Sequence, residues 1–130
     1  MDNSNPELII QTYKKLESEV GQLGSKYREL KGESDEHGLV IDKLSSLNED
    51  RPAYRLVGGV LVKKTVGEIL PVVTENRDGI NKLMTVVDEQ HKKKVQERQA
   101  YKDEHGIMTQ DERQARERAQ KRAQEMASQQ

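Results

Sequence analysis

A stripe of mostly apolar residues, spaced alternately four and three apart, runs along the first third of this chain and limits the folds that it can adopt. The stripe consists of Ile9, Tyr13, Leu16, Val20, Leu23, Tyr27, Leu30, Ser34, His37, Ile41, Leu44 and Asn48. Such a heptad puts a narrow apolar seam on one side of a helix, which is typical of a coiled coil. Asn5 suits the N-cap and Pro6 the first helical position, so we expect a helix over residues 6–48.

The composition supports a long, thinly cored molecule. Hydrophobic residues make up 32% of the 130 residues and charged residues 35%, and Phe and Trp are absent. A compact domain of this length would bury more large apolar side chains. The helix over 6–48 also contains four glycines, each of which costs about 1 kcal/mol relative to alanine. The first helix therefore needs a partner helix.

A β-hairpin is expected over residues 53–64. Two short β-prone runs flank Gly58-Gly59, and a two-residue type I′ turn requires positive φ at both central positions. An isolated hairpin is marginally stable, and its apolar side chains alternate onto both faces. The hairpin is therefore expected to pair with other chains through the residues Tyr54, Leu56, Val57, Gly58, Gly59, Val60, Leu61 and Val62.

A second helix is expected over residues 65–105. Thr65 and Glu68 have the spacing of a capping box, and Pro71 should kink or restart the helix. Its seam runs through Ile69, Val73, Asn76, Ile80, Leu83 and Val87. Two helices of similar length joined by a hairpin predict a mainly α fold: a long antiparallel two-helix coiled coil bent at the hairpin, within a domain of residues 1–109.

The segment 110–130 contains no Leu, Ile, Val or aromatic residue, so it has nothing large to bury. We expect a charged, mobile tail in which helix forms only transiently.

Several function classes are excluded by what the sequence lacks. It has no cysteine, no phosphate-binding glycine loop, no nucleophile motif and no cluster of metal ligands. We therefore expect no enzyme, no catalytic or metal site and no cofactor. The net charge is −1, which argues against nucleic acid as a partner, and no apolar stretch is long enough to span a membrane. We expect a protein that is neither secreted nor membrane-bound.

The ends of the helices away from the hairpin carry the more informative apolar residues. In an antiparallel pair, one cluster would form from Leu8, Ile9, Ile10, Tyr13, Tyr101, Ile107 and Met108. One interpretation is that these residues close the end of the coiled coil. The other is that they form an exposed tip that contacts other proteins.

The hairpin and its surroundings resemble beta-type prefoldin subunits. The resemblance covers roughly residues 6–108, and its most specific part is the stretch from Tyr54 to Val62 followed by Thr65-Val66, Glu68-Ile69-Leu70-Pro71 and Asn76. It implies a heterohexamer of two alpha-type and four beta-type prefoldin subunits, in which hairpins form β-barrels and coiled-coil arms hang free.

The resemblance also implies a function. Members of this family act as ATP-independent co-chaperones that hold nonnative actin, tubulin and other chains at the arm tips and pass them to the cytosolic group II chaperonin. It would make Tyr54 to Lys63 assembly strands and the apolar tip residues client contacts. A cytoplasmic location is implied, and a nuclear role stays open. The alternative is a structural scaffold or tethering subunit that binds no client.

Overall fold

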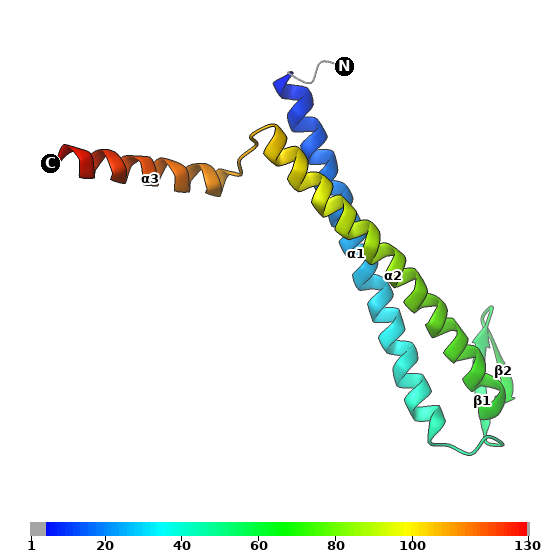
Figure 1. The fold of residues 1–130 in the computed structure, drawn as a ribbon. Coiled ribbons are helices and arrows are strands. Elements are labelled where there is room, and N and C mark those ends of the chain that lie inside the picture. Colours follow the sequence, from blue (N-terminus) through cyan, green and yellow to red (C-terminus); the bar gives the residue numbers. More distant parts are fainter. Residues whose placement is uncertain (1–4, 130) are drawn as a thin grey trace. The chain divides into compact units, whose positions relative to one another are not determined.

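The computed structural model describes residues 5–129. Its elements, in chain order, are α1 (Pro6–Ser45), β1 (Pro52–Val57), β2 (Val60–Thr65), α2 (Val66–Glu104) and α3 (Gln110–Ser128) (Figure 1). Two units divide the chain: the hairpin unit is Ser18–Lys94, and the terminal unit combines the residues up to Glu17 with those from Val95 onward. The predicted fold class, two long antiparallel helices joined by a β-hairpin, is confirmed.

Within the hairpin unit, α1 and α2 pack along the predicted seam. Buried seam side chains there include Val20, Leu30, Ile69 and Val87, each at most 9% exposed. Polar contacts join the same two helices, because the Ser34 hydroxyl donates to Asn81 Oδ1 at 2.6 Å and Lys94 pairs with Glu19 at 2.6 Å. One seam on each helix is therefore the whole interior of this unit's helical part.

The helix starts follow the local signals in the sequence. Asn5 Oδ1 accepts the N–H of Glu7 at 3.0 Å, and Thr65 Oγ1 accepts the N–H of Glu68 at 3.3 Å, so both caps are confirmed. Of the two alternatives expected at Pro71, a kink or a restart, the restart is wrong, because α2 continues through this residue. Pro71 lies early enough in α2 that the carbonyl deprived of its partner belongs to the first turn, at Gly67.

The observed ends of the elements differ little from the expected ones. The first helix ends at Ser45 and not at residue 48, because Asn48 begins a turn in which its carbonyl accepts the N–H of Arg51 at 3.0 Å. Each strand extends one residue beyond the expected hairpin, so Pro52 pairs with Thr65. The second helix begins one residue later and ends one residue earlier than expected.

The last segment differs from the expected tail. Residues 110–128 form one helix, α3, whose N-cap Thr109 accepts the N–H of Glu112 at 3.2 Å. The segment has no Gly or Pro and consists largely of Ala, Gln, Glu and Arg, which are good helix formers. All described side chains of α3 are nevertheless exposed, as expected from the lack of large apolar residues. Capping and propensity, not burial, account for this helix.

Candidate functional site

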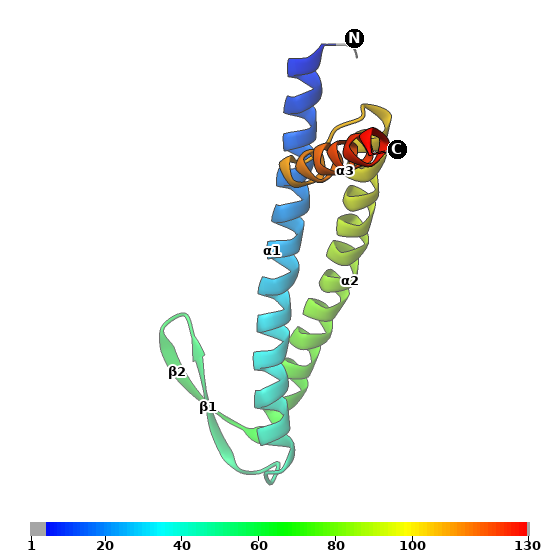
Figure 2. The same cartoon turned by 90° about the vertical axis from the view of Figure 1, so that its left-hand side faces the viewer.

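One face of the hairpin is left uncovered. In the antiparallel ladder Leu56 lies opposite Leu61 and Tyr54 opposite Lys63, and residues opposite each other share a face. Tyr54, Leu56 and Leu61 are 65–68% exposed. On the other face, Arg55 and Val62 are partly covered, whereas Val57 and Val60 beside the turn are exposed. Figure 2 shows the hairpin standing away from the helices beyond its base. The face with Tyr54, Leu56 and Leu61 is therefore an exposed apolar surface of the hairpin unit.

The hairpin turn and edges also suit pairing with further strands. Gly58 and Gly59 have φ of 54° and 82°, the left-handed values that a type I′ turn needs. Among the described residues the sheet holds only these two strands, so each strand leaves one edge without a ladder partner. Unpaired edges beside an apolar face are the features by which a sheet accepts strands from another chain.

A second apolar surface lies in the terminal unit, where a groove of about 550 Å³ separates the first turns of α1 from the connection between α2 and α3. We call it the tip groove. Its lining residues are Pro6, Ile9, Ile10, Tyr13, Lys14, Glu17, His105, Gly106, Ile107, Met108, Thr109 and Arg113. Apolar side chains from segments nearly a hundred residues apart thus meet in one concave surface.

The structure brings five of the seven expected tip residues into this groove: Ile9, Ile10, Tyr13, Ile107 and Met108. Leu8 is exposed and lies outside the lining. Tyr101 also lies outside the lining, and its ring packs against His105 with the ring centroids 4.3 Å apart. The groove is open, so the apolar residues at this end are not fully covered by the coiled coil.

The wall formed by residues 105–109 owes its shape to a helix-stop signal. Gly106 has φ of 61°, the Ile107 N–H donates to the Lys102 carbonyl at 2.9 Å, and the Gly106 N–H approaches the Asp103 carbonyl at 3.4 Å. These bonds form a Schellman motif with glycine at the left-handed position. The motif ends α2 and turns Ile107 and Met108 toward the groove.

An ion pair fixes the start of α3 to the end of α2. The Lys102 ammonium donates to Glu112 Oε1, and the Lys102 side chain is only 17% exposed. This hydrogen bond raises the pKa of Lys102 above 10.5 and lowers the pKa of the Glu112 carboxyl below 4.5. Arg116 Nη1 also lies 3.8 Å from Met108 Sδ. The Lys102–Glu112 ion pair and the contact of Arg116 with Met108 therefore both hold the wall of the groove in place.

Most of the remaining lining residues were not predicted from the sequence. Gly106 could have been found as a glycine that directly follows a helical pattern, and Thr109-x-x-Glu112 has the spacing of a capping box. Lys14 and Glu17 lie one and two turns after Ile10 on the same side of α1. No sequence pattern indicated that Arg113 would line the groove, because its position depends on the turn at Gly106.

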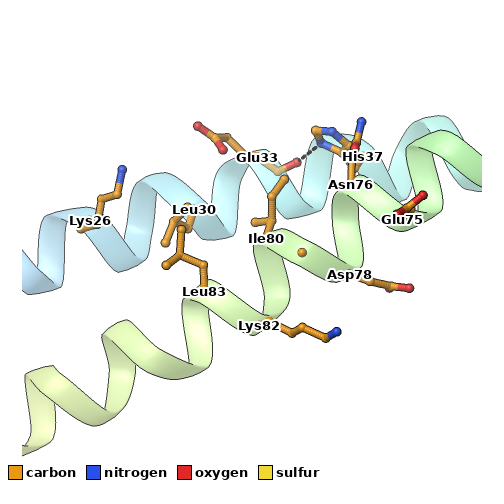
Figure 3. A pocket seen from close by; sticks show the side chains of 11 residues that line it. Lys26, Leu30, Glu33, His37, Glu75, Asn76, Asp78, Ile80, Lys82 and Leu83 are labelled. Carbon is orange, nitrogen blue, oxygen red and sulfur yellow. Dashed lines mark hydrogen bonds between the residues drawn. The ribbon is translucent and has the colours of Figure 1, made fainter.

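The hairpin unit contains a further open pocket between α1 and α2 (Figure 3). Leu30, Ile80 and Leu83 lie between the two helices, whereas Lys82 and Asp78 point outward. His37 Nδ1 lies 2.7 Å from the Glu33 carbonyl of its own helix. His37 is thus a polar seam residue, and the pocket is a loosely packed part of the seam beside Gly79, which contributes no side chain.

In residues 5–129 no three potential metal ligands gather in one place, and no helix of that part is long and apolar enough to cross a membrane.

A family match, similar sequences and a solved structure all point to the same protein family. The prefoldin subunit family matches residues 7–112. The probable prefoldin subunit 2 of Dictyostelium discoideum is 44% identical over 62% of this chain and 70% of its own length. Prefoldin subunit 2 of Bos taurus is 40% identical over 78% of this chain and 66% of its own length. The chain therefore spans about two thirds of the length of these relatives.

A solved structure shares the fold. The crystal structure of the prefoldin beta subunit from Thermococcus strain KS-1 matches with a TM-score of 0.71 at 18% identity, over 80% of this chain and 93% of that chain. Sequence, hairpin and helix pair agree, and the chain belongs to the prefoldin family of non-enzymatic chaperone subunits.

Proposed function

We propose that this chain is an assembly and client-binding subunit of an ATP-independent holdase. Its hairpin joins other alpha-type and beta-type prefoldin subunits into a heterohexamer, and its tip groove holds nonnative proteins such as actin and tubulin until a cytosolic group II chaperonin takes them. The role places the complex in the cytoplasm. The observation that carries client binding is the tip groove, in which apolar side chains line an open surface.

Assembly is supported by the hairpin. Its Tyr54, Leu56 and Leu61 side chains are exposed on one face, and both strand edges are unpaired within the described chain. When another chain covers an exposed apolar face of this kind, the apolar side chains leave water and the assembly is stabilised. Completing a sheet with strands from neighbouring subunits would bury the apolar face and satisfy the edges in one step.

Weak binding at each tip suits a holdase. An open groove lined by a few apolar side chains offers modest affinity, and several tips contacting one client add by multivalency. Release then needs no nucleotide, because a competing binding surface on the chaperonin displaces one contact after another.

The test uses the complex reconstituted with the variant Ile107→Ser with Met108→Ser in this chain. The complex should keep its mass, and in a nucleotide-free assay it should suppress aggregation of denatured actin less well than the unaltered complex. The control is Leu39→Ser, an α1 side chain that is 63% exposed and outside the groove. An intact complex with unchanged suppression would contradict client binding at this groove and favour the alternative of a scaffold subunit.

A further inference from the structure

The rim of the tip groove carries charged side chains that apolar binding does not require. Lys14 and Glu17 of α1 and Arg113 of α3 all line the groove. Two cations and one carboxylate give this rim a net charge of +1 (2 − 1) in a protein whose overall charge is −1. The groove is therefore more positive than the chain as a whole.

The cations of the rim are not neutralised by neighbours within the described residues. The carboxylate next to Arg113 in sequence belongs to Glu112, and it is held by Lys102. Glu117 lines an adjoining groove with Arg113, one turn along α3. In the part of the chain that the structure describes, no ion pair joins Lys14 or Arg113 to a carboxylate. Both cations remain available to a ligand.

Arg113 is positioned by the same contacts that shape the apolar wall. Its N–H donates to the Thr109 carbonyl at 2.9 Å in the first turn of α3. The Lys102–Glu112 ion pair and the approach of Arg116 to Met108 hold this turn beside the groove. The cation and the apolar side chains of Ile107 and Met108 thus form one surface.

We propose that the tip groove selects nonnative segments in which an acidic residue adjoins a large apolar side chain. The apolar side chain would occupy the groove, and Lys14 and Arg113 would attract the carboxylate beside it. This inference rests on the proposed client binding and names the class of client segment. Lys14 lies within the residues that match the prefoldin subunit family, and Arg113 lies just beyond residue 112, where that match ends.

The expected preference is modest. Exposed ion pairs each contribute little, and salt screens them. A segment with an acidic flank should bind about two- to fivefold more tightly than the same segment with a basic flank, the size expected of one or two such pairs. Differences of this order change which segments of an unfolded chain are held when several tips act together.

The experiment measures fluorescence anisotropy with the complex reconstituted around the full-length chain. Three labelled peptides share one unstructured apolar sequence and differ only in flanking residues, which are Asp, Asn or Lys. The Asp-flanked peptide should bind most tightly at low salt, and the difference should disappear in about 1 M salt, where the screening length is about 3 Å.

Matched variants assign the preference to this chain. Lys14→Gln with Arg113→Gln should abolish the difference between the Asp- and Lys-flanked peptides while the Asn-flanked peptide binds as before. Lys15→Gln with Arg118→Gln removes the same charge from the same helices outside the groove and should leave the preference intact.

Three outcomes would overturn the proposal. Equal affinity for the three peptides, or a preference that survives in the Lys14/Arg113 variant, refutes charge selection while client binding stands. Failure of every peptide to bind refutes client binding itself, and the selection with it.

Discussion

Leu56 and Leu61 lie directly opposite each other in the hairpin ladder, and each is about two-thirds exposed. A cross-strand apolar pair normally stabilises a sheet by packing against a layer above it. Here the described residues of the chain provide no such layer for this face. The exposure of this pair therefore supports the proposal that another chain completes the hairpin.

Replacing this pair by Leu56→Asp with Leu61→Asp should abolish assembly, because two carboxylates would be placed where the neighbouring strands pack. Native mass spectrometry of the reconstitution mixture should show the variant outside the complex, and circular dichroism should show its helices intact. The control is Leu39→Asp with Val40→Asp, which places two carboxylates on exposed apolar positions of α1 outside the hairpin. A full-mass complex containing the hairpin variant would refute the assembly role.

The seam predicts a contrast between two leucines on one helix. Leu30 is 3% exposed and Leu39 is 63% exposed. Leu30→Ala should lower the free energy of unfolding by about 2–5 kcal/mol, because it removes buried methyl groups and leaves a cavity. Leu39→Ala should change it by less than about 0.5 kcal/mol. Thermal and denaturant unfolding of the two variants checks this, and equal losses would mean that the seam does not hold the helices together.

Replacing Gly59 and Gly79 by alanine should change the stability of the protein in opposite directions. Gly59 has φ of 82°, so Gly59→Ala should destabilise the hairpin by about 1–2 kcal/mol. Gly79 lies within α2, and an added Cβ there would meet no atom within 4 Å. Gly79→Ala should therefore stabilise the protein by up to about 1 kcal/mol. Paired unfolding curves test both, and stabilisation by Gly59→Ala would exclude the type I′ turn.

The junction between α2 and α3 should loosen in acid. The pKa of Glu112 is lowered by Lys102, so this ion pair contributes stability above pH 4.5, the ordinary value, and loses it as the pH falls through the lower folded pKa. The pKa of Lys102 is raised, so the stability that its ammonium group contributes is complete below pH 10.5. This stability is lost only as the pH rises through the higher pKa that Lys102 has in the folded state.

The methyl resonance of Met108 reports this change, since Met108 lies between the junction and the groove. In the unaltered chain it should shift as the pH falls below 4.5, and in Glu112→Gln that shift should be absent. Asp111→Gln is the matched control, because it removes the neighbouring charge and leaves the ion pair. Identical titrations of the unaltered chain and Glu112→Gln would show that the pair does not hold the wall.

Much of the fold could be predicted because its signals are local. The four-three spacing around Leu30, the Gly58-Gly59 turn and the Thr65 cap each depend on residues within one or two turns of chain. The same kind of local signal is present for α3 in Thr109 and Glu112, yet the lack of large apolar residues in this segment predicts a tail without stable structure. The prediction of a tail without stable structure differed from the structure for that reason.

The tip groove was only partly predictable. Ile9, Ile10, Tyr13, Ile107 and Met108 stood out as apolar residues at the helix ends, whereas Leu8 and Tyr101 share that chemistry and lie outside the lining. Heptad spacing places a residue on a helix face, but it does not say which way the chain turns after the helix ends.

Local patterns in the sequence specify the two helices, the hairpin between them and the shortage of core that makes the chain depend on others. These follow from the period of the apolar residues and from turn chemistry. The grouping of Ile107, Met108 and Arg113 with Lys14 around one groove depends instead on tertiary contacts. The direction of the chain after α2 is set by the left-handed Gly106 together with the Lys102–Glu112 pair, and such a pair forms only when the turn brings the two charges together.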